Sequence, residues 1–254
     1  MLTLRPNSPL VATIKPSPNH DARSDVGHPD MLVLHYTGMA DGGAALERLC
    51  APDSRVSAHY VLFEDGRIVQ CVAEARRAWH AGESSWEGES DINSRSIGIE
   101  IVNPGHDLGC PDFPAVQIEA VIALCHDIIT RHRIRADLVV GHSDAAPHRK
   151  RDPGEKFPWR RLYEAGVGLW VEPVEITTDA GLRLGDHGTA VARVQALLGT
   201  YGYGVTRSGS FDEFTRHVVV AFQRHFRPAL IDGVADRSTI ATLERLIIAR
   251  AAIP

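Results

Sequence analysis

The chain has 254 residues, of which 44% are hydrophobic and 23% charged, with a formal net charge of -5. At roughly 150 residues per domain, this length allows one large domain, or a large one plus a small one, and the acidic balance argues against a generally basic nucleic-acid binder. No apolar run approaches the roughly 20 residues of a membrane span, while 13 histidines hint at a metal or proton-transfer site.

The N-terminal segment, residues 1–29, is interrupted by prolines at positions 6, 9, 16 and 18. This pattern predicts an irregular arm on the surface. The segment lacks the basic start and the apolar stretch that are typical of a signal peptide. We therefore expect a cytoplasmic protein, with the periplasm or cell envelope as the alternative.

Short apolar runs and amphipathic stretches alternate over the next part of the chain. Strands are predicted at 31–34, 59–63, 68–72, 96–101 and 137–140, and helices at 44–50 and 115–133. The second and third strands flank an Asp-Gly turn, which indicates a hairpin. In the fourth, Ile97, Ile99 and Ile101 lie on one face and Glu100 on the other. The mixture predicts an α/β fold with a mixed central sheet flanked by helices.

Beyond residue 181 the pattern changes to three amphipathic stretches, 188–199, 212–226 and 236–250. Their apolar spacing is typical of helices, and about 70 residues suffice for a small three-helix unit. We therefore predict an α/β domain over 1–170, which includes the arm 1–29. A linker over 171–180 and a three-helix domain over 181–254 complete the chain.

Two histidines, His35 and His142, directly follow predicted strands, and Asp152 lies in the loop after His142. Ends of neighbouring strands converge in space, so these side chains can share one site. Two imidazoles, one carboxylate and an open position form a known catalytic zinc arrangement. Glu100 is a candidate general base, and Lys150 is a candidate for stabilising an oxyanion.

Each of these residues also has an ordinary structural explanation. A histidine after a strand is usually structural, and a glutamate opposite an apolar face is usually solvated. An aspartate before Pro-Gly is usually a turn residue. The helical zinc motif H-E-x-x-H is absent from the sequence. Spacing alone therefore leaves the metal site and the structural explanation both open.

Five segments in order carry a resemblance: 31–38 (MLVLHYTG), 56–60 (VSAHY), 78–82 (AWHAG), 93–100 (NSRSIGIE) and 141–154 (GHSDAAPHRKRDPG). Over about residues 28–165 the chain resembles the zinc-dependent N-acetylmuramoyl-L-alanine amidases of type 2, in their bacterial AmpD/AmiD branch. The resemblance implies Zn²⁺ held by His35, His142 and Asp152, with Glu100 as base and Lys150 as stabiliser of the transition state.

The implied reaction is hydrolysis of the amide between N-acetylmuramoyl, or its 1,6-anhydro form, and L-alanine. Peptidoglycan or muropeptides would be the substrate, in wall turnover or recycling, and no obligate protein partner is expected. One alternative is a muropeptide receptor without catalysis, a class that lacks the metal ligands. The other is hydrolysis of a different amide at the same zinc site.

Five further residues are candidates for substrate contacts. Trp79 and His80 resemble the family's cleft wall, where an aromatic face stacks on sugar. Arg95 and Asn103 flank Glu100 in sequence and are candidates for holding carboxylate or carbonyl groups. His59 is a candidate for lining the cleft, with core packing as the alternative.

Two residues close to His142 in the sequence, Asp144 and His148, are candidates for supporting the metal ligands. Ligating histidines are commonly oriented by hydrogen-bond partners of this kind. We therefore expect one or both to lie beside the metal centre.

The C-terminal segment carries a second resemblance, through its Gly, Asp and apolar positions between 182 and 239. Over about residues 180–250 it resembles the peptidoglycan-binding three-helix domain. Such a domain would raise the local concentration of polymer at the active site. The alternative is a packing appendage that restricts the cleft.

Overall fold

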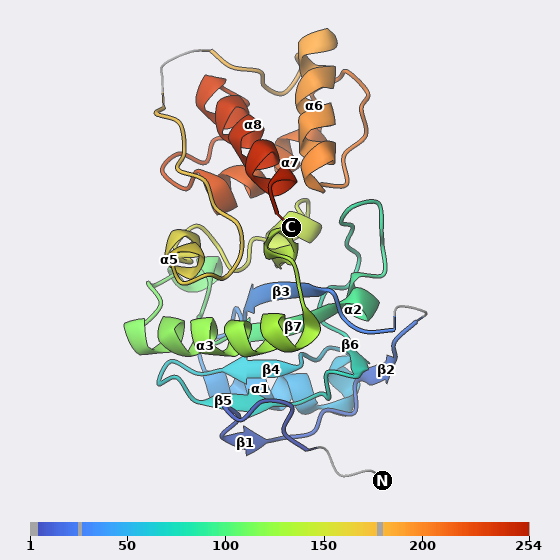
Figure 1. The fold of residues 1–254 in the computed structure, drawn as a ribbon, viewed down its shortest axis with the longest axis vertical. Coiled ribbons are helices and arrows are strands. Elements are labelled where there is room, and N and C mark those ends of the chain that lie inside the picture. Colours follow the sequence, from blue (N-terminus) through green and yellow to red (C-terminus); the bar gives the residue numbers. More distant parts are fainter. Residues whose placement is uncertain (1–4, 25–26, 177–179, 254) are drawn as a thin grey trace.

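The computed structural model describes residues 5–24, 27–176 and 180–253. Figure 1 shows two parts stacked along the long axis: a sheet with its helices, and three helices above it. The predicted α/β fold with a C-terminal helical region is confirmed.

The larger sheet has six strands in the order β1-β5-β4-β7-β3-β8. Their bounds are β1 Thr13–Ile14, β3 Met31–Tyr36, β4 Tyr60–Leu62, β5 Ile68–Gln70, β7 Ser96–Ile101 and β8 Val139–Gly141. Strands β4, β7, β3 and β8 pair in parallel, whereas β5 is antiparallel to β4. A separate antiparallel pair joins β2 (His20–Ala22) to β6 (Arg76–Ala78). The sheet is therefore mixed, as predicted.

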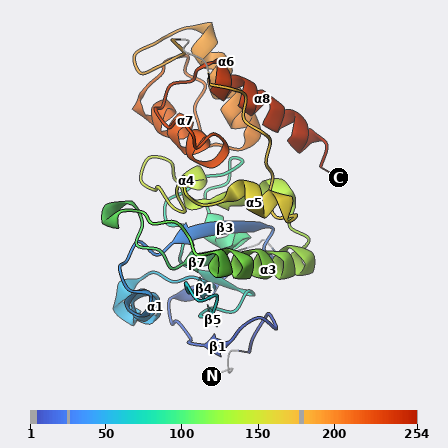
Figure 2. The same ribbon diagram turned by 90° about the vertical axis from the view of Figure 1, so that its left-hand side faces the viewer.

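Helices cover both faces of this sheet. Helix α3 (Ala115–His132) lies on one face and α1 (Gly42–Cys50) on the other, as Figure 2 shows. The strands between them are mostly apolar because both of their faces are buried, and their polar members include His35 of β3 and Glu100 of β7. In β4, for example, Tyr60 and Leu62 join the core cluster that includes α3, and Val61 joins the cluster that includes α1. Three short helices complete this part: α2 (Ile92–Arg95), α4 (His142–Ala145) and α5 (Trp159–Glu164).

The parallel strands bring three sequence-distant segments to one edge. In the register of β3 and β7, His35 pairs with Glu100, and Leu34 pairs with Gly141 of β8. These positions lie at the carboxyl ends of their strands, where open α/β sheets bind ligands. Residue 142 begins α4 directly beyond this edge. The fold thus collects the predicted site residues at the ends of β3, β7 and β8.

Two sequence predictions need correction. The segment 1–29 is not simply irregular, because β1 and β2 lie in it; residues 1–4 and 25–26 fall outside the described ranges. Strand β1 pairs with β5 at the sheet edge. Its two residues are too few to show the alternation of apolar and polar side chains by which a strand is predicted. The strand predicted at 137–140 begins later, at Val139, because residues 136–138 form a 3-10 turn.

The three predicted C-terminal helices are confirmed as α6 (Thr189–Tyr201), α7 (Glu213–Phe226) and α8 (Arg237–Ala251). Asp212 and Asp236 cap α7 and α8, each accepting a hydrogen bond from a threonine amide in the first turn. Of the predicted linker, residues 171–176 lack regular structure and 177–179 are outside the described ranges. Within those ranges, no helix combines the length and apolar character needed to cross a membrane.

Candidate metal centre and active site

Three ligand-type atoms converge at the ends of β3 and β8. Nδ1 of His35 lies 2.9 Å from Nδ1 of His142, and Oδ2 of Asp152 lies 3.1 Å and 3.0 Å from these two nitrogens. All three residues are buried. The backbone holds α4 against the loop that carries Asp152, since the amide of Ser143 donates to the carbonyl of Asp152 at 2.9 Å. The structure therefore brings together the three residues predicted as metal ligands.

The hydrogen bonds around the two imidazoles assign their protons. His142 Nε2 lies 3.0 Å from the carbonyl of Ala81, which only accepts, so Nε2 carries the proton. His35 Nε2 lies 3.0 Å from Nδ1 of His80, whose Nε2 lies 3.1 Å from Ser96 Oγ. The Ser96 hydroxyl donates onward to the carbonyl of Ile92 at 2.6 Å. Each ring therefore donates away from the centre, and both Nδ1 atoms turn a lone pair toward it.

The charges at the centre favour a cation. Burial and the neighbouring His142 lower the pKa of His35 to about 4, so its imidazole is neutral at pH 7. Burial opposes the charge on Asp152, yet the adjacent His142 and His35 hold the pKa of this carboxyl well below its usual value. The neutral imidazole of His35, Nδ1 of His142 and the Asp152 carboxylate thus face one another at close range. A divalent cation among them would relieve this repulsion, and neutral imidazole is the form that binds metals.

Glu100 stands beside this centre with an unusual protonation equilibrium. Its Oε2 is buried and has no hydrogen-bond partner among the described residues. Burial, followed by the negative charge of Asp152, raises the pKa of Glu100 to about 8, and Lys150 opposes the rise. A carboxyl group with a pKa near neutrality is suited to take up and release a proton.

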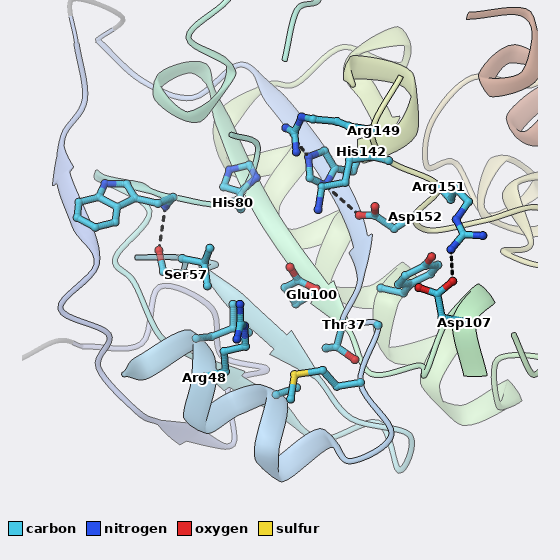
Figure 3. A pocket seen from close by; sticks show the side chains of 18 residues that line it. Thr37, Arg48, Ser57, His80, Glu100, Asp107, His142, Arg149, Arg151 and Asp152 are labelled. Carbon is cyan, nitrogen blue, oxygen red and sulfur yellow. Dashed lines mark hydrogen bonds and ion pairs between the residues drawn. The ribbon is translucent and has the colours of Figure 1, made fainter. Parts of the chain in front are cut away.

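A cleft of about 350 Å³ opens over these groups, and Glu100, Lys150 and Asp152 line it. Figure 3 shows Glu100 pointing into this cleft between the His142–Asp152 pair and Arg48 of α1. Further cationic side chains on the cleft are Arg149 and Arg151, the latter paired with Asp107. The cleft therefore combines a metal-type donor set, a proton-exchanging carboxyl and a cationic rim.

A family model described as N-acetylmuramoyl-L-alanine amidase matches residues 25–155. The chain belongs to this amidase family. A second model, described as a peptidoglycan binding domain, matches residues 187–243. The first match covers most of the sheet-containing part of the amidase, and the second covers α6, α7 and the first half of α8.

Individual relatives extend these matches over most of the chain. The amidase is 39% identical over 229 residues to the N-acetylmuramoyl-L-alanine amidase AmiD of Escherichia coli, covering 85% of this chain and 82% of AmiD. It is 37% identical over 164 residues to the 1,6-anhydro-N-acetylmuramyl-L-alanine amidase AmpD of Citrobacter freundii, covering 58% and 86%. The AmpD match thus spans a smaller share of this chain.

Two solved structures share the whole arrangement. AmpDh3 from Pseudomonas aeruginosa superposes with a TM-score of 0.73 at 32% identity, covering 99% of this chain and 100% of that chain. E. coli AmiD, in complex with anhydro-N-acetylmuramic acid-L-Ala-D-gamma-Glu-L-Lys, superposes with a TM-score of 0.72 at 36% identity, covering 89% and 91%. The amidase therefore has the fold of these enzymes in both of its parts.

The motif at 93–100 has a structural reason at each of four positions. The side chain of Asn93 accepts from the amides of His80 and Ala81 at 3.0 Å and 2.8 Å, and Ser96 binds the far side of the His80 ring. At Gly98 a Cβ would lie 2.4 Å from Cγ of His80, so only glycine leaves room for this ring. Glu100 then follows in the cleft.

This geometry changes the interpretation of His80. The residue lines the cleft, as predicted, but only 7% of its surface is exposed. One ring nitrogen faces His35 and the other faces Ser96, so no polar atom of the ring is free for substrate. His80 instead orients His35, one of the predicted metal ligands.

The structure does not bring His59, Arg95 and Asn103 to the cleft, because none of the three lines it, and their contacts with substrate stay untested predictions. His59 has no exposed surface, and its Nδ1 accepts from the amide of Gly98. Arg95 directly precedes β7, at the end of the strand opposite Glu100, and its guanidinium donates two hydrogen bonds to the Asp30 carboxylate. Asn103 is buried and holds the following loop, donating to the carbonyl of Pro111 and accepting from the amide of Gly105.

Trp79, in contrast, lies on the cleft wall as predicted, half-buried. Its indole nitrogen donates to Asp21 of β2 at 2.7 Å, and its amide donates to Ser57 Oγ at 2.8 Å. The N-terminal segment therefore helps to hold the aromatic wall. The stacking of Trp79 on sugar stays a prediction.

The two residues expected beside His142 have different surroundings. Asp144 is buried but touches no ligand side chain; it accepts from the amide of Gly141 at 2.8 Å. His148 is exposed and packs near Phe214 of α7, with ring centroids 5.7 Å apart. Neither orients a ligand imidazole directly.

One series of hydrogen-bonded side chains at the cleft was not predicted from the sequence. The Tyr36 hydroxyl lies 2.9 Å from His106 Nδ1, and His106 Nε2 lies 3.0 Å from Glu155. Arg224 of α7 donates to the same carboxylate at 3.3 Å. The only available signal was the position of Tyr36, directly after a ligand.

Proposed function

We propose that the chain is a zinc-dependent hydrolase that cleaves the amide between N-acetylmuramoyl, including its 1,6-anhydro form, and L-alanine in muropeptides. The observation that carries the proposal is the convergence of two imidazole lone pairs and the Asp152 carboxylate beside Glu100. A His₂-carboxylate set is typical of catalytic zinc. The family membership supports the amide bond as the target.

His35, His142 and Asp152 would hold the zinc ion. When bound, zinc polarises a carbonyl and makes water more acidic. Glu100 takes a proton from the attacking water and delivers it to the nitrogen of the departing L-alanine, so one residue serves first as base and then as acid. Lys150 places a positive charge on the same cleft, where it stabilises the negative oxygen that forms on the scissile carbonyl.

The rim of the cleft supports an acidic peptide as substrate. Arg48, Arg149, Lys150 and Arg151 line it. The ligand solved with AmiD contains a γ-linked D-glutamate, a linkage that leaves the α-carboxylate of that residue free. Guanidinium groups bind carboxylates strongly and with defined geometry. We infer that the stem peptide lies along this rim, and that Trp79 contacts the sugar.

The C-terminal helices are proposed to bind peptidoglycan, on the support of the matching domain model. The domain limits at 170 and 181 stay predictions, and so does the cytoplasmic location with its periplasmic alternative.

Mass spectrometry of the products tests the proposed bond. The protein is incubated with zinc and 1,6-anhydro-N-acetylmuramoyl-L-Ala-D-γ-Glu-L-Lys. We expect the free sugar acid and a tripeptide with an N-terminal L-alanine. Cleavage between the amino acids would show a peptidase at the same centre, and tight binding without products would show a receptor. Either outcome would overturn the proposal.

A further inference from the structure

A buried carboxylate, Asp144, lies between the amidase part and the C-terminal helices. Its side chain is 1% exposed and accepts three hydrogen bonds. Oδ2 accepts from the amide of Gly141 at 2.8 Å and from Nδ1 of His225 at 2.7 Å, and Oδ1 accepts from the hydroxyl of Tyr203 at 2.7 Å. His225 belongs to α7 and Tyr203 follows α6, so two of the three donors come from the C-terminal part. Figure 2 shows this junction, with α4 below α7.

Both donors are locked in place by aromatic packing. The ring of His225 stacks on Trp159 of the amidase part, with centroids 3.8 Å apart, and on Phe226 at 3.7 Å. Tyr203 packs edge-on against Trp86, with ring centroids 5.0 Å apart. Trp86 belongs to the amidase part and lies in the loop before α2. One continuous apolar cluster includes both parts of the chain. The junction is therefore a folded core and not a loose tether.

The third donor leads directly to the metal centre. Gly141 is the residue before His142, and a Cβ at this position would lie 2.8 Å from Cδ of Pro153, the residue after Asp152. The segments that carry two of the three ligands thus touch at Gly141. Asp144 holds the amide of that glycine, and the C-terminal helices hold Asp144.

We propose that Asp144 is a positioning residue through which Tyr203 and His225 of the C-terminal part set the backbone of the metal centre. This inference rests on the proposed zinc-dependent function. The C-terminal helices then have a second role besides polymer binding: they complete the framework of the catalytic site. Loss of either donor leaves one oxygen of the buried Asp144 carboxylate without that hydrogen bond. We expect the carboxylate to shift in response and to move the backbone at Gly141 with it.

The test uses the full chain with Tyr203→Phe, which removes one hydroxyl and keeps the ring. Tyr201→Phe is the matched control, since Tyr201 packs against the same Trp86 and its hydroxyl makes no hydrogen bond to Asp144. His225→Phe is a second variant that keeps a stacking ring. Zinc affinity is measured by competition with a chromogenic chelator, and ligand geometry by the visible spectrum of the Co²⁺-substituted protein.

We expect zinc affinity to fall about threefold or more in Tyr203→Phe and in His225→Phe, and further in the double variant. Direct partners of metal ligands cost about tenfold or more, and Asp144 acts one step further away. The Co²⁺ spectrum should shift in the same variants, a change that a general loss of stability would not produce. Tyr201→Phe should match the wild type in both measurements.

The inference is overturned if both single variants keep the zinc affinity and the Co²⁺ spectrum of the wild type. A shift of equal size in Tyr201→Phe would also overturn it, because aromatic packing alone would then explain the effect. Failure of the proposed function looks different: the wild type itself would bind no zinc or cleave no muropeptide.

Discussion

His35 and Glu100 occupy partner positions in the parallel pairing of β3 and β7. A proposed metal ligand and the proposed base are therefore placed beside each other by the backbone of two buried strands. Rigid strands position catalytic groups more reproducibly than loops do. The relationship also explains why Glu100 is the only charged residue within β7, whose other five residues are buried.

Glu100→Gln should abolish most of the activity without loss of metal. The amide keeps the shape of the carboxylate but cannot take a proton from water, and general base catalysis typically contributes about 10²–10⁴-fold. We expect kcat to fall within that range, with zinc content unchanged by elemental analysis. Retention of more than about half of kcat would remove Glu100 from the mechanism.

The same residue predicts a pH dependence of stability in the metal-free protein. The folded protein holds a proton on Glu100 up to a pKa of about 8, whereas the ordinary value is 4.5. The folded state thus binds more protons over this interval, and Glu100 lowers stability progressively as pH rises from 4.5 to 8. One pKa unit corresponds to about 1.4 kcal/mol, so the effect amounts to a few kcal/mol.

Urea unfolding of metal-free wild type and Glu100→Gln at pH 5 and pH 9 measures this contribution. The variant should gain stability relative to the wild type at pH 9, and the difference should shrink toward pH 5. An equal difference at both values would show that the folded-state pKa is not raised.

Lys150→Met is expected to lower kcat by about 10²–10³ with little change in KM, as for loss of one oxyanion-stabilising group. Lys156→Met is the control, because Lys156 pairs with Asp112 and does not line the cleft. Steady-state kinetics on a soluble muropeptide separates the two constants. A rise in KM alone would instead make Lys150 a substrate-binding residue.

The hydrogen-bond chain from His35 through His80 to Ser96 predicts that Ser96 affects the metal. Ser96→Ala should weaken zinc binding by about tenfold, because the His80 ring loses the acceptor that orients it toward the ligand. Ser94→Ala is the matched control, since Ser94 is equally buried but its hydroxyl contacts Ser24 and Asp91 and not His80. Zinc competition assays compare the two, and equal affinities would show that the chain has no effect on the centre.

Arg48 on α1 is predicted to bind a carboxylate of the stem peptide. Arg48→Gln should raise KM about three- to tenfold with kcat unchanged, as expected for loss of one charge-assisted contact worth roughly 1 kcal/mol. A substrate with isoglutamine in place of glutamate lacks that carboxylate and should not respond to the substitution. Equal responses of the two substrates would contradict this assignment.

The convergence of His35, His142 and Asp152 was predictable from sequence because each of them follows a strand or lies in a motif. The helices and the alternation of apolar and polar residues over Ile97–Glu100 were predictable because burial of one face gives apolar residues a regular spacing in the sequence. The role of His80 was not, because its partner His35 lies 45 residues away and the clue, Gly98, has no side chain. Asp144 and His225 are 81 residues apart, and nothing local marks a histidine in an amphipathic helix as a buried partner. His59 and Arg95 lie away from the cleft because each precedes its strand, and closeness in sequence to a site residue does not show at which end of a strand a side chain lies.

Titration of metal-free protein with zinc tests the central claim most directly, with hydrolysis of a soluble muropeptide as the readout. The account predicts no activity without metal and a linear rise that ends at one zinc per chain. Asp152→Ala should bind zinc weakly and stay inactive at one equivalent. Full hydrolysis by protein shown to contain no metal would contradict the account.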